Sequence, residues 1–235
     1  AQEFLNYEGY RVILAQSHED ADSERINLQM MEDYRVEGII ISVCHNRKNI
    51  DIYMDLIDKG IPLVFIDRTV KNIPASQVKI DDYMKAFFMV EHLIRLGKRK
   101  NGYKDALKKF QIPFDPAYLI SSGVNFEDGE KSMEAFIQKK IPFDAVFCFT
   151  EMSAFGAKSC LQQHGLSIPK DVSICCISGT VLSTLVHPSM TAVEQPVKLM
   201  AKTSVELMIE KLENPKVPNR EVILDAEMII RESTE

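Results

Sequence analysis

The amino-acid sequence predicts an α/β fold made of two lobes, each a doubly wound parallel sheet. Three observations lead to this prediction. Short apolar runs of strand length alternate with longer amphipathic segments, as in parallel strands joined by helical crossovers. The alternation breaks once, at residues 97–102, and then resumes, which divides the chain into two successive units. The length of 235 residues also suffices for one large or two small domains.

In the first half of the chain, glycine and short polar residues mark where helices end and begin. Gly9 and Gly60 follow helical patterns, and the polar residues 20–23 can cap the free amides of a helix start. Continuous apolar runs such as RVILA at residues 11–15 indicate strands that are buried on both faces. The elements expected here are helices at 1–7, 20–34 and 50–59 and strands at 11–15, 38–43, 63–66 and 78–80.

The next helix, expected at residues 82–96, is apolar around a perimeter too wide for a single contact with a sheet. We favour a helix that packs on its sheet and on a second subunit, with Met84, Phe87, Phe88 and Glu91 at a homodimer interface. The alternative is a helix enclosed entirely by its own domain.

After this helix, a strand is missing from the alternation. The basic turn GKRKNG at residues 97–102 leads directly into another helical pattern at residues 103–110. The elements expected beyond it are strands near 118–121 and at 145–149, 172–177, 190–193, 221–224 and 228–230, helices at 127–139 and 153–164, and a long helix that Pro196 opens and that ends at residue 212.

Composition and charge exclude several classes of protein. With 46% hydrophobic and 26% charged residues the chain is soluble and globular, and its longest apolar runs are far shorter than a bilayer requires. A net charge of −6 has the wrong sign for binding DNA through these residues alone. The five cysteines are odd in number and show no CxxC spacing, which favours a reduced, cytoplasmic setting. The chain does not begin with Met, so we treat it as a fragment.

Catalytic and metal-binding motifs do not emerge. Neither GxGxxG nor GxxxxGK[ST] occurs, the two SxxK matches at residues 76–79 and 167–170 lie beside prolines, and the five histidines lack metal-ligand spacing. We therefore predict no enzyme, no cofactor and no metal. Asp67, Asp81 and Asp82 stand out because they follow predicted parallel strands, at the edge where open α/β sheets bind ligands. For Asp81 and Asp82, capping of the next helix is an equally good interpretation.

Five stretches together resemble one family. They are YRVEGIII at 34–41, IPLVFIDR at 61–68, VKIDDYMKAFFMVEHLIRLGKRK at 78–100, AVFCFTEMSAFGAKSCLQQHGLSIPKDV at 145–172 and LSTLVHPSMTAVEQP at 182–196. Their order and spacing are similar to those of the effector-binding core of LacI/GalR-type transcriptional repressors, whose fold is the type I periplasmic-binding-protein arrangement. The resemblance covers nearly the whole chain.

The resemblance implies a domain division and two missing parts. The lobes would comprise residues 1–99 with 195–223 and residues 100–194 with 224–235. The family's helix-turn-helix, hinge helix and first strand would precede residue 1. A strand and a ligand-facing loop would follow Lys100, and they are either deleted or omitted from this sequence. We favour omission, because loss of a central strand leaves sheet edges unsatisfied.

Ligand-binding positions are carried over from the family one by one. Arg35 matches an effector-contacting Arg of some members, Asp82 follows the crossing strand, and Phe126 can provide an aromatic wall for a sugar ring. Thr150 and Glu151 stand where the family usually has Asn-Asp, and Gln195 lies at the lobe crossover. Ser178 replaces an Asp of many sugar- and purine-responsive members, which leaves the effector's identity open.

The function implied by the resemblance is that of a switch. A small metabolite, a sugar or sugar derivative, would bind between the lobes and alter the affinity of a cytoplasmic homodimer for operator DNA, which is bound through a segment outside this chain. The main alternative is a periplasmic sugar-binding protein of a transport or sensing system. Cys175 and Cys176 argue against export. An enzyme on this fold is a third, weaker alternative.

Overall fold

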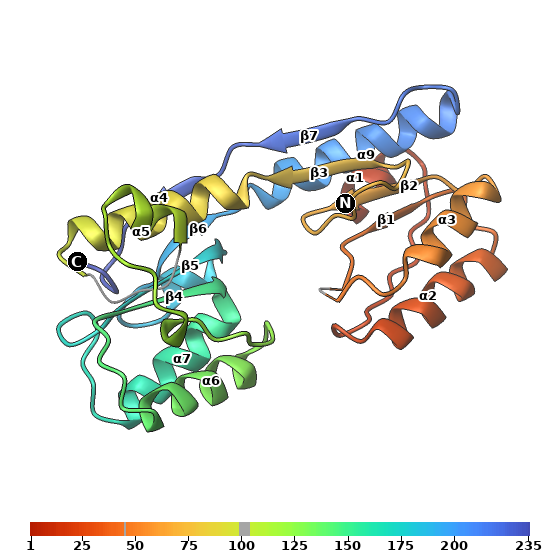
Figure 1. Ribbon diagram of the computed structural model, residues 1–235. Coiled ribbons are helices and arrows are strands. Elements are labelled where there is room, and N and C mark those ends of the chain that lie inside the picture. The colour runs from red at the N-terminus through yellow and green to blue at the C-terminus, as the bar shows by residue number, and fades with distance from the viewer. Residues whose placement is uncertain (45, 99–103) are drawn as a thin grey trace. The chain divides into compact units, whose positions relative to one another are not determined.

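The structure, a computed structural model, describes residues 1–44, 46–98 and 104–235, and it divides into two compact units (Figure 1). The first consists of Ala1–Ile80 and Pro196–Asp225, and the second of Asp81–Gln195 and Ala226–Glu235. Each contains a four-stranded sheet with helices packed on it. The predicted fold class, α/β with two doubly wound sheets, is therefore confirmed.

The first unit is built on an all-parallel sheet. Its strands lie in the order β1 (Ile39–Ile41), β2 (Leu63–Ile66), β3 (Ser76–Ile80) and β7 (Glu221–Leu224). Its helices are α1 (Gln2–Tyr7), α2 (Ala21–Asp33), α3 (Ile50–Asp58) and α9 (Val197–Glu213). Leu63, Val64 and Phe65 are all buried, so helices cover both faces of β2. As the sequence predicted, a short polar residue begins α2: Asp20 accepts a hydrogen bond from the Ser23 amide at 2.7 Å.

The strand predicted at residues 11–15 does not form. These residues have no regular secondary structure, and Leu14 is 78% exposed. A run of four apolar residues after Arg11 is compatible with a buried strand, but a strand also needs a hydrogen-bonded neighbour. Among the described residues, β1 pairs only with β2, so this prediction was wrong.

The second unit has a mixed sheet in the order β4 (Ala145–Thr150), β5 (Ser173–Gly179), β6 (Thr191–Glu194) and β8 (Glu227–Ile229). The first three strands are parallel, whereas β8 runs antiparallel to β6, which the sequence did not predict. The helices are α4 (Asp82–Arg95), α5 (Lys104–Lys109), α6 (Phe126–Gln138), α7 (Glu151–Gln163) and α8 (Leu182–Leu185), with a 3-10 helix at Pro116–Tyr118. None of the helices in the described ranges is long and apolar enough to cross a membrane.

The division into units differs from the expected lobe boundaries in the region of α4. We expected residues 1–99 to belong with the first sheet, but the unit boundary falls between Ile80 and Asp81. Helix α4 contacts α5 and β5, and its Val90 and Ile94 share a buried cluster with Leu107. The apolar face of α4 therefore packs within the second unit.

A second predicted strand, near residues 118–121, is also absent. In its place the 3-10 helix Pro116–Tyr118 leads into extended chain without strand pairing. A cavity of about 370 Å³ separates this segment from β4, and aromatic side chains, among them Tyr118, Phe136 and Phe143, line it. β4 thus ends the sheet as far as the described chain goes, because β5 is its single strand neighbour there.

Helices α6 and α7 cross at two glycines. A Cβ atom at Gly129 would lie 2.0 Å from the Ser153 carbonyl oxygen, and one at Gly156 would lie 1.9 Å from that of Phe126. Backbone atoms obstruct both positions, so no side chain can rotate away to make room. Only glycine allows this close approach of the two helices.

Replacement of Gly156 by Ala is expected to lower the free energy of unfolding. Alanine favours a helix by about 1 kcal/mol over glycine, but overpacking against backbone costs about 1–3 kcal/mol and separates the helices. Urea-induced unfolding followed by circular dichroism measures the difference. Gln162→Ala, at an exposed site on the same helix, is the control and should leave the midpoint unchanged. A midpoint for Gly156→Ala equal to that of the control would contradict the close packing.

Candidate functional site

Polar side chains meet at the carboxyl ends of the parallel strands in the second unit. Thr150 ends β4 and pairs in register with Ser178 of β5. Gly179 of β5 is in register with Glu194 of β6, and the amide of Gln195 donates to the Gly179 carbonyl at 3.4 Å. Thr150 and Ser178 on neighbouring strands, and Gln195 directly after β6, therefore lie at one edge, where open α/β sheets bind their ligands.

The hydroxyl groups at this edge have contrasting local roles. Thr150 is the N-cap of α7: its Oγ1 accepts from the Ser153 amide at 3.1 Å and donates to the Val124 carbonyl at 2.6 Å. Ser178 is half-buried, and its hydroxyl donates to the Phe149 carbonyl at a long 3.4 Å. The Ser178 hydroxyl is thus less strongly held and is better able to exchange its partner for a ligand.

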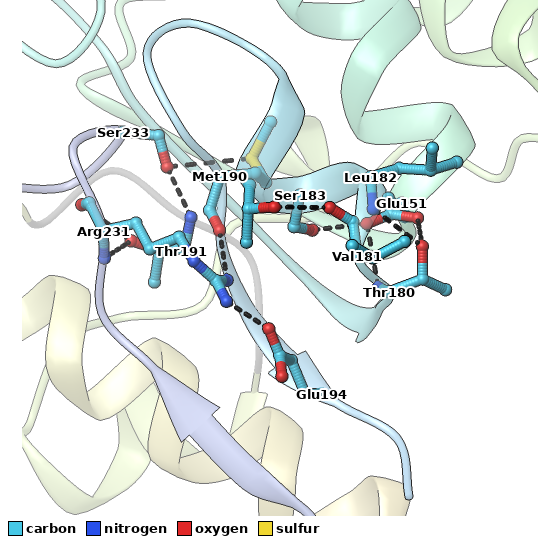
Figure 2. A network of polar contacts seen from close by, with 11 residues as sticks. Glu151, Thr180, Val181, Leu182, Ser183, Met190, Thr191, Glu194, Arg231 and Ser233 are labelled. Atoms are coloured by element: carbon cyan, nitrogen blue, oxygen red, sulfur yellow. Dashed lines mark hydrogen bonds and ion pairs between the residues drawn. The ribbon is translucent and has the colours of Figure 1, made fainter. Parts of the chain in front are cut away.

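Glu151 is buried, with 4% of its surface exposed, and its carboxylate is fully engaged (Figure 2). It accepts hydrogen bonds from the Thr180 amide at 2.9 Å, the Thr180 hydroxyl at 2.7 Å and the Ser183 hydroxyl. These donors lie on the turn and on α8, which follow β5, whereas Glu151 directly follows β4. This arrangement supports a role in positioning residues 180–183, and the direct contact with a ligand stays a prediction.

A second part of the network fastens the end of the chain to β6 (Figure 2). Arg231 donates to the Met190 carbonyl at 2.9 Å and forms an ion pair with Glu194. The Thr191 amide donates to the Ser233 hydroxyl at 2.8 Å, and that hydroxyl donates to the Ile174 carbonyl at 2.6 Å. Sequence reasoning missed these residues, because 37 to 59 positions separate the partners and no local pattern links them.

Asp82 and Phe126 each occupy the first position of a helix. The preceding residue of α4, Asp81, is its N-cap and accepts from the Met84 amide at 3.0 Å, which supports the capping interpretation for Asp81. Phe126 is half-buried and follows Asn125, whose side chain forms a capping box with Asp128. The backbone at Phe126, the first residue of α6, is thus fixed by this capping box.

Arg35 lies away from the carboxyl edge of its own sheet. It follows α2 in a left-handed backbone conformation, with φ of 53°, four residues before β1 begins. It is therefore placed at the amino end of β1. At the carboxyl end of this sheet, Arg68 instead forms a two-pronged ion pair with Glu19, at 2.7 and 2.5 Å.

A buried carboxylate also organises the first unit. Glu24 accepts from the Cys44 amide at 2.7 Å, from Asn49 Nδ2 at 2.9 Å and from the Tyr53 hydroxyl. This links α2, α3 and the chain that leaves β1. The sequence analysis did not single out Glu24.

The cysteine thiols near the strands are not activated nucleophiles. Burial raises the pKa of Cys148 to about 12, and burial together with the carboxylate of Glu24 raises that of Cys44 to about 11. Both groups therefore stay protonated at neutral pH, whereas a nucleophilic cysteine needs a lowered pKa.

The four residues predicted at a homodimer interface divide into two pairs. Met84 and Phe88 are exposed, at 37% and 44%. Phe87 packs against the cluster beneath α4, and Glu91 is 7% exposed and forms ion pairs with Arg95 at 2.6 Å and Lys109 at 3.0 Å. The side chains of Phe87 and Glu91 are thus engaged within the second unit, and the dimer interface stays a prediction.

Removal of the Glu151 carboxylate is expected to destabilise the second unit. Glu151→Ala leaves the amide of Thr180 and the hydroxyl of Ser183 without their acceptor, which costs about 2–4 kcal/mol. Thermal unfolding measures the effect. Glu151→Gln keeps the shape and one acceptor oxygen and should lose less. An alanine variant as stable as the parent chain would refute a positioning role.

Comparison with known proteins places the chain in a family. Residues 91–234 match the model of a periplasmic binding protein-like domain. The ribose operon repressor of Haemophilus influenzae is 26% identical over 249 positions, which cover 99% of this chain and 74% of that protein. The arabinose metabolism transcriptional repressor of Geobacillus stearothermophilus is 27% identical over 259 positions, covering 100% and 71%. Both alignments exceed the 235 residues of this chain, so these relatives contain residues that it lacks.

Solved structures share the fold. The transcription regulator CcpA of Lactococcus lactis superposes with a TM-score of 0.90 at 21% identity, covering 99% of this chain and 91% of that one. A LacI family transcriptional regulator from Enterococcus faecium with bound ribose has a TM-score of 0.86 at 22% identity, covering 99% and 90%. The two relatives described above, which align with nearly the whole chain, are transcriptional repressors, and the chain belongs to the periplasmic binding protein-like domain family.

Proposed function

We propose that this chain is the effector-sensing domain of a LacI-type transcriptional repressor, and that it binds a small sugar-like metabolite. The observation that carries the proposal is the polar edge of the second sheet, where Thr150 and Ser178 lie on adjacent strands and Gln195 directly follows the next one. Two relatives that align with almost the whole chain are named for the ribose operon and for arabinose metabolism.

The chemistry of this edge suits a neutral polyol. Sugar hydroxyl groups both donate and accept hydrogen bonds, as do the Ser178 hydroxyl and the side-chain amide of Gln195. Phe126, half-buried at the start of α6, offers an aromatic ring for stacking on a sugar face. Neither Ser178 nor Gln195 is charged, which favours a neutral sugar over a cationic or phosphorylated ligand.

The effector changes the affinity for operator DNA because it binds one conformation of the repressor better than the other. A ligand shifts the equilibrium between two conformations only as far as it binds one of them better. We place the repressor in the cytoplasm as a homodimer, in which the exposed Met84 and Phe88 contribute to the subunit contact. Operator DNA would be bound through a segment that is not part of this chain.

A panel of pentoses, hexoses and disaccharides, tested by thermal unfolding of the purified chain, identifies the effector. A sugar at 100 times its dissociation constant adds about 2.7 kcal/mol to the free energy of unfolding and raises the melting temperature. The absence of a shift with every sugar, alongside a shift with a purine, would overturn the sugar assignment.

Substitution at the polar edge tests where the sugar binds. Ser178→Ala and Gln195→Ala each remove about 1 kcal/mol of hydrogen bonding to the ligand, so each should weaken sugar binding by about 5-fold. Isothermal titration calorimetry measures the dissociation constants. Gln162→Ala is the matched control, exposed and remote from the edge on α7. Unaltered sugar affinity in both edge variants would place the ligand elsewhere.

The coupling to DNA is tested with the full-length regulator. Titration onto its operator with and without the identified sugar should show a change in affinity of about 5- to 150-fold. An upstream sequence that encodes a secretory signal in place of a helix-turn-helix would favour a periplasmic sugar-binding protein and would contradict the proposal.

A further inference from the structure

We propose that Glu134, Cys160 and His164 form a zinc-binding site between α6 and α7. One ligand atom from each side chain, a carboxylate oxygen, the thiol sulfur and an imidazole nitrogen, lies within 4.8 Å of the other two. Sulfur, nitrogen and oxygen donors are the ligands that Zn²⁺ prefers in proteins, at about 2.0–2.3 Å. The site is independent of the proposed sensing of a sugar.

The two helices place these donors by their own periodicity. Cys160 and His164 are four residues apart, and the His164 amide donates to the Cys160 carbonyl at 3.1 Å in the last turn of α7, so both side chains share one face. Glu134 comes from the facing helix α6, which packs closely on α7 through Gly129 and Gly156. The cluster therefore rests on two rigid elements and requires no loop to close.

The carboxylate of Glu134 is oriented toward the other two donors. Its Oε1 accepts from Gln138 Nε2 at 2.9 Å, which leaves Oε2 directed at His164 Nε2, 2.6 Å away, and at Cys160 Sγ, 3.6 Å away. A metal ion would replace the protons that these three groups now share.

Burial and charge around the cluster fit a three-ligand site with one open position. Cys160 is 1% exposed, whereas the side chains of Glu134 and His164 are 42% and 38% exposed, so solvent can supply the fourth ligand. The Glu130 carboxylate, which accepts from Gln163 at 3.2 Å, adds negative charge one turn away on α6. The bound ion would hold the carboxyl-terminal ends of α6 and α7 together.

Titration of the untagged, reduced chain with Co²⁺ and then Zn²⁺ tests the site. Co²⁺ should produce a sulfur-to-cobalt charge-transfer absorption, and Zn²⁺ should abolish it by displacement. Calorimetry of Zn²⁺ binding in buffers of different ionisation enthalpy should show release of about one proton, from the Cys160 thiol. Absence of the charge-transfer absorption would overturn the proposal.

Single substitutions assign the ligands. Cys160→Ser should abolish the absorption, and Glu134→Gln and His164→Gln, at exposed positions that do not endanger folding, should each weaken Zn²⁺ binding by at least about 10-fold. Two controls should bind as the parent chain does. Cys148→Ser removes another thiol, and His187→Gln removes a histidine paired with Glu232 at 3.2 Å. Binding that survives Cys160→Ser, or that is lost in His187→Gln, would assign the metal to adventitious surface histidines and refute the site.

Discussion

The burial of the Glu151 carboxylate constrains the candidate site more than any other interaction. An ionised carboxylate removed from water costs several kcal/mol unless its oxygens are hydrogen-bonded. Three donors from residues 180–183, in the turn and the first residues of α8, satisfy Glu151. Since Glu151 follows β4 and its donors follow β5, these hydrogen bonds hold the ends of the two strands together. The same ends carry the paired residues Thr150 and Ser178.

The last strand of the second unit, β8, supports the strand that precedes Gln195. β8 pairs antiparallel with β6, and the segment after it returns through Arg231 and Ser233 to the start of β6 and to β5. These contacts give the backbone groups of β6 partners along both sides. Gln195, which directly follows β6, is therefore carried by a strand that is held on both flanks. Residues at the very end of the chain thus help to position a residue of the site.

The sequence predicted correctly the elements whose ends depend on neighbouring residues, such as a capping side chain or the limit of an apolar run. The strands at residues 63–66 and 221–224 have their predicted bounds, and Asp20 and Asp81 cap helices as short polar residues do. The prediction of a strand at residues 11–15 was wrong because an apolar pattern indicates burial but does not show which strand could pair with it. Glu151 was predicted as a ligand contact from its position in a family motif. That contact stays a prediction, whereas the hydrogen-bond donors that surround Glu151 lie 29–32 residues away, beyond the reach of any local pattern.

Helix α7 connects the two sites proposed for the second unit. It begins at its N-cap Thr150, at the polar edge, and ends near His164, a distance of about 20 Å for 13 residues. Binding at one end influences the other only if the helix has two alternative positions that the ligands distinguish. The glycine crossing argues against such movement, since backbone of α6 contacts α7 at Gly156 and backbone of α7 contacts α6 at Gly129. A metal ion at the far end would therefore add stability to the unit without changing the affinity of the polar edge for its ligand.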